Sequence, residues 1–275
     1  MKKPSLVVRL IVYALLIITM ILINLPFFWM VITAFKNESD VFSFPPKFYP
    51  TILDLRNFVS AFKVIPLGRY LFNTLFVSLC VTMIQLVFNV LAAYGLSRFS
   101  FKGREVIFMI LVGTLMIPMQ VILVPLYIIV RNLKILNTYW ALIVPFMSSA
   151  FGVFLLRQFF MSIPKELEDA AKIDGCGRLR ILWSIILPLS KPALWTMALY
   201  TFLAQWNSYM WPLVSINNDR LQLIQVGISK FASTWETQWT YQMAASTIAV
   251  IPIIIFFFFV QKQFIEGISI SGTKG

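Results

Sequence analysis

The side chains best suited to catalysis or metal binding are few in this 275-residue sequence. Histidine is absent, which excludes histidine-dependent proton transfer, histidine metal ligation and Ser-His or Cys-His nucleophiles. The two cysteines, Cys80 and Cys176, form no CxxC pair and are interpreted as small hydrophobic residues. No GxxxxGK(S/T) phosphate-binding loop occurs. We therefore expect no catalytic residue, no metal site and no cofactor, and any ATP chemistry must belong to another chain.

The segment SIPKELEDAAKIDG holds a dense group of carboxylates. Pro164 suits the first turn of a helix, and carboxylates directly after it are favoured by the positive end of the helix dipole. Gly175 is suited to end the same helix. The pattern predicts a short helix over about residues 163–175. Its carboxylates are Glu166, Glu168, Asp169 and Asp174.

Periodicity divides this predicted helix into two faces. One stripe holds Ile163, Leu167, Ala170, Ala171 and Asp174, and the other side holds Lys165, Glu168 and Lys172. The small residues Ala170, Ala171 and Gly175 let another surface approach the backbone closely. On this pattern alone two interpretations stay open: a stiff helix that transmits force between proteins, and an ordinary surface helix.

A second group of polar residues lies inside an apolar stretch, QWNSYMW. Aromatic faces with amide and hydroxyl groups bind sugars, so these residues are candidates for a substrate path, together with the weaker candidates Gln120 and Asn89. The candidates in the stretch are Gln205, Trp206, Asn207, Ser208 and Tyr209. The alternative is that they hydrogen-bond to neighbouring helices and mark the membrane interface.

The hydrophobic segments that carry these residues predict a membrane protein. Only 12% of the residues are charged and 59% are hydrophobic, against about 25% charged in a soluble domain. Six stretches longer than 20 residues lack charge: 10–35, 70–97, 106–130, 135–156, 192–218 and 237–261. About 20 residues of helix cross the hydrocarbon core, and continuous apolar runs do not fit a barrel. We therefore expect an all-α protein with six transmembrane helices, the third kinked at Pro118 or Pro125.

The loops indicate the orientation of these helices. With both termini in the cytoplasm, fourteen Lys and Arg residues lie inside and nine outside, which agrees with the positive-inside rule. We therefore expect a multi-pass cell-membrane protein with an uncleaved first span and both termini cytoplasmic. The net charge of +12 is assigned to anionic lipid and topology, not to nucleic acid.

Two external loops are expected from this topology. Residues 36–69 predict an ordered, extended cap, because prolines and aromatics alternate in FSFPPKFYP. Residues 214–241 form either a surface for an extracellular partner or a lid packed on the helices.

The charge-free spans argue against an acid-based ion-coupling site, which leaves a passive channel, a structural subunit or a permease driven by another protein.

The stretch DAAKIDG, followed by nine residues and IILP, resembles the EAA signature of ABC importer permeases. Asp169 stands where that family usually has Glu; the positions in register are Ala170, Ala171, Gly175, Ile185, Leu187 and Pro188. The resemblance implies a coupling helix that docks in a groove of an ATP-binding subunit. Its candidate coupling residues are Glu168, Asp169, Ala170, Ala171, Asp174 and Gly175.

Residues from about Arg69 to Gly275 are similar to the carbohydrate-uptake branch of that family, the maltose-type and glycerol-3-phosphate-type permeases, in particular to its smaller permease partner. This implies the MetI-like fold, with a first helix and loop over 1–69 and a core over 70–275. The implied assembly has a second permease, two ATP-binding subunits and an extracytoplasmic sugar-binding protein. The alternatives are a permease for a sugar phosphate, amino acid or peptide, and a non-transport membrane subunit.

Overall fold

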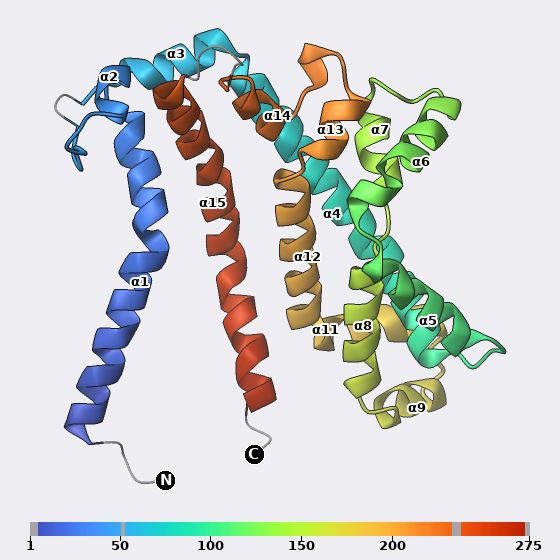
Figure 1. The fold of residues 1–275 in the computed structure, drawn as a ribbon. Coiled ribbons are helices and arrows are strands. Elements are labelled where there is room, and N and C mark those ends of the chain that lie inside the picture. The colour runs from blue at the N-terminus through green and yellow to red at the C-terminus, as the bar shows by residue number, and fades with distance from the viewer. Residues whose placement is uncertain (1–4, 51–52, 233–237, 273–275) are drawn as a thin grey trace. The chain divides into compact units, whose positions relative to one another are not determined.

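The computed structural model describes residues 5–50, 53–232 and 238–272, with side chains up to residue 261. The fold is all-helical, as predicted (Figure 1). Its α-helices are α1 (Leu6–Ala34), α2 (Glu38–Val41), α3 (Arg56–Val64), α4 (Leu67–Arg98), α5 (Arg104–Gly113), α6 (Met119–Asn132), α7 (Tyr139–Ile143), α8 (Ala150–Ser162), α9 (Glu166–Ile173), α10 (Arg178–Ile181), α11 (Leu187–Leu189), α12 (Lys191–Trp206), α13 (Met210–Ser215), α14 (Ile224–Ser229) and α15 (Trp239–Gly272). The shorter elements are the 3-10 turns η1 (Thr114–Met116), η2 (Val144–Phe146) and η4 (Asp219–Leu221) and the π-helical η3 (Leu182–Ile186).

The chain divides into two compact units, which are described separately. One unit comprises Met1–Leu67 and Gly227–Ile251, and the other comprises Gly68–Val226 and Pro252–Gly275. The sequence-based division into residues 1–69 and 70–275 stays a prediction. Both units combine segments that are distant in the sequence, because the last helix, α15, contributes to each.

Four helices among the described residues are long and apolar enough to cross a membrane: Leu6–Ala34, Leu67–Arg98, Tyr139–Ser162 and Trp239–Gln261. Two bent pairs raise the number to six when each pair is one span. The pair Arg104–Met116 and Met119–Asn132 bends by 106°, and the pair Arg178–Leu189 and Lys191–Trp206 bends by 80°. The prediction that proline breaks the third span is confirmed at Pro118, whose extended backbone (ψ 144°) precedes α6.

The charge-free stretch 192–218 is not one continuous helix. Helix α12 ends at Trp206, and a separate helix, α13, begins at Met210. The Asn207 side chain donates at 3.0 Å to the Leu203 carbonyl, which also accepts from the Asn207 backbone N–H at 3.0 Å. Asn and Ser side chains compete with the helical backbone in this way, so a charge-free composition does not guarantee a continuous helix.

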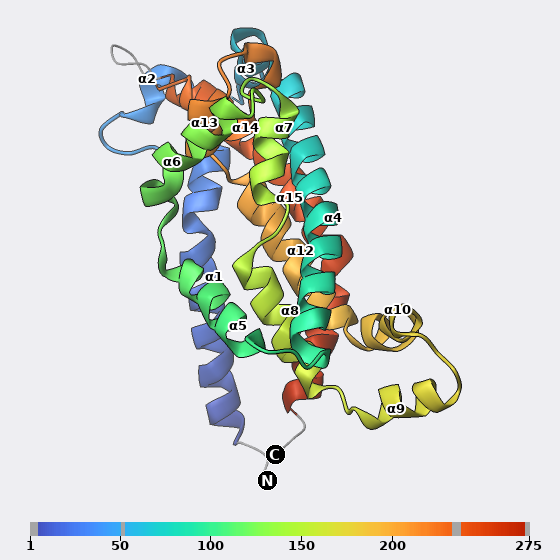
Figure 2. The same ribbon diagram turned by 90° about the vertical axis from the view of Figure 1, so that its right-hand side faces the viewer.

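Helices α4, α8 and α12 are joined by a buried polar network around Asn89, whose side chain is fully buried. The Asn89 Oδ1 atom accepts from Ser148 Oγ at 2.9 Å and from the Ser149 N–H at 3.1 Å. Gln85 Oε1 accepts from Thr201 Oγ1 at 3.0 Å, which adds α12 to the network. Figure 2 shows the three helices side by side. Asn89 therefore has a structural role, since its polar atoms bind neighbouring helices.

In its described residues, the loop after α1 is not the extended cap that the prolines suggest, because it contains α2 and α3. Asn57 Nδ2 donates to the carbonyls of Ala34 at 3.0 Å and Lys36 at 2.7 Å, which caps the end of α1. The Glu38 carboxylate accepts from the backbone N–H groups of Trp239 and Thr240 at 3.0 Å. This loop therefore satisfies the polar ends of both α1 and α15.

The segment between α13 and α15 divides into two parts. Leu223, Ile224 and Val226 are buried, and the Thr74 hydroxyl of α4 accepts from the Ile224 N–H at 2.8 Å. Residues 217–220 are exposed. The packed-lid interpretation therefore agrees with the burial of residues 223–226, and the exposed tip at 217–220 is open to a partner.

We predict that Gly152→Ala destabilises the protein. A Cβ at position 152 would lie 2.2 Å from Asn89 Nδ2, so the polar network must shift, at a cost of about 1–3 kcal/mol. Gly95→Ala is the control, because a Cβ there meets nothing within 4 Å. Thermal unfolding of the purified variants in detergent measures the difference. Equal melting temperatures for the two variants would contradict this packing of α8 against α4.

Candidate functional site

Helix α9 lies outside the candidate spans, at one end of the unit that contains α4 and α8 (Figure 2). Its first turn holds Glu166, Glu168 and Asp169, and its last turn holds Lys172, as the helix dipole favours. The chain turns into it after Ile163 and Pro164. The short helix predicted from the acidic segment is therefore present, over Glu166–Ile173.

Gly175 ends α9 in a left-handed conformation, with φ of 77°. The Gly175 N–H donates to the Lys172 carbonyl at 3.0 Å, and the Cys176 N–H donates to the Ala171 carbonyl at 2.9 Å. This pair of bonds is a Schellman motif, in which glycine takes the one position with positive φ. The predicted role of Gly175 as the helix stop is confirmed.

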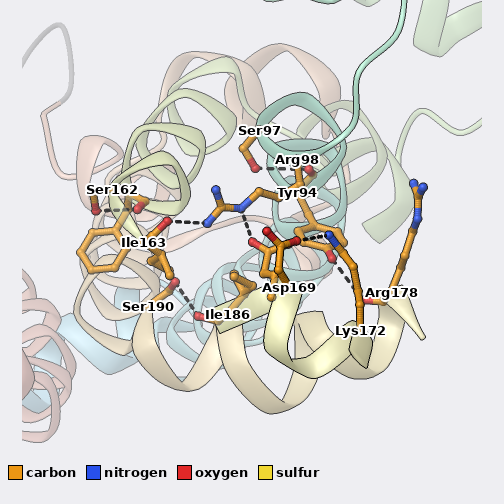
Figure 3. Close-up of polar contacts among 12 residues, drawn as sticks. Tyr94, Ser97, Arg98, Ser162, Ile163, Asp169, Lys172, Arg178, Ile186 and Ser190 are labelled. Carbon is orange, nitrogen blue, oxygen red and sulfur yellow. Dashed lines mark hydrogen bonds and ion pairs between the residues drawn. The ribbon is translucent and has the colours of Figure 1, made fainter. Parts of the chain in front are cut away.

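One face of α9 is buried against its own chain and carries an ion pair. Arg98, the last residue of α4, contacts Glu168 Oε1 through its Nε atom, and both side chains are less than 10% exposed. Arg98 Nη2 also donates to the Ile163 carbonyl at 2.9 Å. Figure 3 shows the Arg98 guanidinium between that carbonyl and α9. A charge buried this deeply requires such a partner, so the pair determines which face of α9 points inward.

A second contact secures the chain just beyond α9. The Tyr94 hydroxyl of α4 donates to the Arg178 carbonyl at 3.2 Å (Figure 3). The Arg178 guanidinium in turn lies over the Phe99 ring, 4.4 Å from its centroid. The end of α4 thus contacts the segment before, within and after α9, and this places α9 in a defined position.

The faces of α9 differ from those that periodicity suggests. Glu168, assigned to the polar side, is buried together with Ala171, whereas Leu167, Ala170 and Asp174 of the opposite stripe are exposed. The buried ion pair with Arg98 causes this rotation. Sequence reasoning missed Arg98 as a residue of this site. The sequence marks it only as one of three cations, without an acid, in the loop SRFSFKGR.

The exposed face of α9 combines charge, a small residue and an apolar residue. Asp169 pairs with Lys172 at 2.7 Å, and this contact lowers the pKa of the Asp169 carboxyl group. Ala170 leaves the backbone accessible, and Ile173 is 87% exposed.

The candidate substrate-path residues do not share one environment. Trp206 is buried and stacks on Phe202, with ring centroids 5.6 Å apart. Asn207 is exposed, and its Oδ1 accepts from Gln225 Nε2 at 3.3 Å. Gln205 and Ser208 are half-buried, and Tyr209 and Gln120 are exposed, the latter in the first turn of α6. These contacts favour packing for Trp206 and leave Asn207 accessible.

No group of His, Cys, Asp and Glu side chains suited to a metal ion occurs among the described residues. Cys80 and Cys176 are free thiols in partly buried, mainly apolar surroundings.

Residues 85–270 match the family described as "Binding-protein-dependent transport system inner membrane component". The chain is 39% identical to the probable ABC transporter permease protein YurM of Bacillus subtilis, over 96% of this chain and 88% of that protein. It is 34% identical to the arabinooligosaccharides transport system permease protein AraQ of Halalkalibacterium halodurans, over 83% of this chain and 82% of that protein. The sn-glycerol-3-phosphate transport system permease protein UgpE of Yersinia pestis is 33% identical, over 93% of this chain and 94% of that protein.

A solved structure has the same fold. It is a bacterial ABC transporter involved in the import of the acidic polysaccharide alginate, with 26% identity, a TM-score of 0.82 and coverage of 96% of this chain and 100% of that chain. The family match over residues 85–270 includes α9, the region in which the carboxylates gather. The chain therefore belongs to the family of inner membrane components of binding-protein-dependent transport systems, as a non-catalytic, multi-pass permease subunit of an ABC transporter.

Proposed function

We propose that this permease, paired with a second permease, forms the membrane path of an importer for a sugar or oligosaccharide. Two ATP-binding subunits and an extracytoplasmic sugar-binding protein complete the assembly. The proposal is supported by the relatives, whose names specify arabinooligosaccharides and sulfoquinovosyl glycerol. The similar solved transporter imports an acidic polysaccharide. The relative that transports sn-glycerol-3-phosphate makes a sugar-phosphate-like solute the second candidate.

The observation that carries the proposal is the exposed, anchored helix α9. Its inner face is held to the end of α4 by the Arg98–Glu168 pair, and its outer face presents Asp169, Ala170 and Ile173. A helix held this firmly can transmit a displacement from a docked ATP-binding subunit. Glu168 and Ala171 take part on the buried face that orients α9, whereas Asp169, Ala170, Asp174 and Gly175 define its exposed surface and its end.

We propose that α9 and both termini lie on the cytoplasmic side. The excess of Lys and Arg on the loops of that side supports this orientation. A reporter active only in the cytoplasm should work when fused after Lys102, Lys172 or Gly275, and should fail after Pro50, Leu133 or Lys230. Reversal at two or more of these sites would contradict the orientation.

Transport by the whole complex tests the solute class. The permease is reconstituted in proteoliposomes with its partner permease, ATP-binding subunits and binding protein, and uptake is measured for a panel of oligosaccharides, monosaccharides, sugar phosphates, amino acids and peptides. We expect ATP-dependent uptake of an oligosaccharide or monosaccharide. Uptake confined to amino acids or peptides, or a complex that hydrolyses ATP without moving any solute, would overturn the proposal.

Gly175→Val should impair coupling more than Gly177→Val. A branched residue at φ of 77° costs at least about 1–2 kcal/mol, whereas Gly177 has an ordinary φ of −71°. A Cβ added at either position would meet no other atom within 4 Å, so strain in the backbone distinguishes the two. We expect the Gly175 variant to assemble but to lose binding-protein-stimulated ATP hydrolysis. Normal stimulation in that variant would show that α9 is not the coupling element.

A further inference from the structure

The ends of α4 and α8 are held together by two arginines, each of which donates a hydrogen bond to a backbone carbonyl at the end of the other helix. Arg98, at the end of α4, donates to the carbonyl of Ile163, the residue that ends α8. Arg157, on α8, donates through Nε to the Leu96 carbonyl in the last turn of α4 at 3.1 Å. Carbonyls in the last turn of a helix have no partner within it, so each arginine satisfies the end of the other helix. We call these four residues the α4–α8 junction.

Each arginine of the α4–α8 junction also binds a carboxylate from a further helix. Arg98 pairs with Glu168 of α9. Arg157 Nη2 donates to both carboxylate oxygens of Glu105 on α5, at 2.8 and 2.9 Å. The Arg157 guanidinium lies over the Phe108 ring of α5, 3.8 Å from its centroid. Helices α5 and α9 are therefore attached to one junction by the same kind of contact.

Both arginine side chains are almost completely buried, with 4% of Arg98 and 5% of Arg157 exposed. Separating a buried guanidinium from its carboxylate leaves a charge without a partner, which is strongly unfavourable. A displacement of α9 therefore carries Arg98 and the end of α4 with it, and Arg157 extends the displacement to α5. Helix α5 begins the bent pair that turns by 106° before α6.

We propose that Arg98 and Arg157 are positioning residues that make α9 and α5 move as one body, so that a displacement of α9 reaches the bent α5–α6 pair. The proposal deepens the assignment of α9 as the coupling helix and rests on it. Glu105 is 55% exposed and also contacts Arg104, whereas Glu168 is buried. The α5 link is therefore the weaker of the two and can be altered with less risk to folding.

The test compares Glu105→Gln with Arg104→Gln in the complete reconstituted complex. Glu105→Gln removes both ion pairs of Glu105, those with Arg104 and Arg157, whereas Arg104→Gln removes only the pair with Arg104. We expect Glu105→Gln to lower the solute moved per ATP hydrolysed about fivefold or more while the complex still assembles. Arg104→Gln should keep the unmodified ratio. An unchanged ratio in Glu105→Gln would overturn the proposal.

A second measurement does not depend on the identity of the solute. Spin labels are placed at Val106→Cys on α5 and Glu166→Cys on α9, both exposed positions, after Cys80 and Cys176 are replaced by alanine. We expect the distance between the two spin labels to be the same before and after ATP addition. When Glu105→Gln is added, we expect ATP to change or broaden this distance. A separation that changes with ATP without that substitution would overturn the proposal. If the complex fails to take up sugar but the distance between the labels stays constant, the sugar assignment is wrong, whereas the joint movement of α9 and α5 is still supported.

Discussion

The arrangement of the candidate site depends on the buried ion pair between the Arg98 guanidinium and the Glu168 carboxylate. It lies at the end of a long apolar helix, α4, where the chain leaves the region without charge. Removing either partner of a buried ion pair costs about 3–5 kcal/mol, because the other charge stays behind. Arg98 therefore keeps Glu168 inward and the Ile163 carbonyl bonded at the same time. The orientation of α9 follows from these two contacts.

Between the ends of the spans, the same unit uses neutral polar groups instead of charge. Asn89 and Gln85 of α4 bind Ser149 on the α8 side and Thr201 on α12, and the further partners are the Phe146 carbonyl and the Met197 thioether, so every partner is uncharged. Neutral networks avoid the desolvation penalty of ions, and they still specify how helices pack. The charged contacts are placed at the end of the unit, where α9 and α5 attach. The interior of the unit is therefore packed through neutral groups, and the ion pairs of Arg98 and Arg157 hold α9 and α5 at its end.

This division suits a subunit that moves without performing chemistry. Membership of the permease family assigns ATP hydrolysis to other components, and the chain has no nucleotide-binding loop. A permease then needs a surface to receive a displacement and a stiff route to its spans. In the proposed mechanism, helix α9 provides this surface, with Ile173 and Ala170 exposed, and the α4–α8 junction transmits the displacement. The broken spans add places where rigid segments can change angle, at Pro118 and at Ser190.

Composition and local signals determined much of this protein. Charge-free stretches of sufficient length specify apolar helices, because the backbone must satisfy its own polar groups in lipid. The acidic first turn and Gly175 specify α9 and its end, since both act within a few residues. Only the tertiary structure decided which face of α9 is buried, because periodicity groups residues on a stripe without showing where a partner such as Arg98 lies. The break of α12 after Trp206 is accompanied by a local bond, from Asn207 to Leu203 four residues earlier, and Trp206 stacks on Phe202 of the same helix. By contrast, only the folded chain brings Phe256 of α15 onto Phe202, with ring centroids 4.1 Å apart, because these two residues are distant in the sequence.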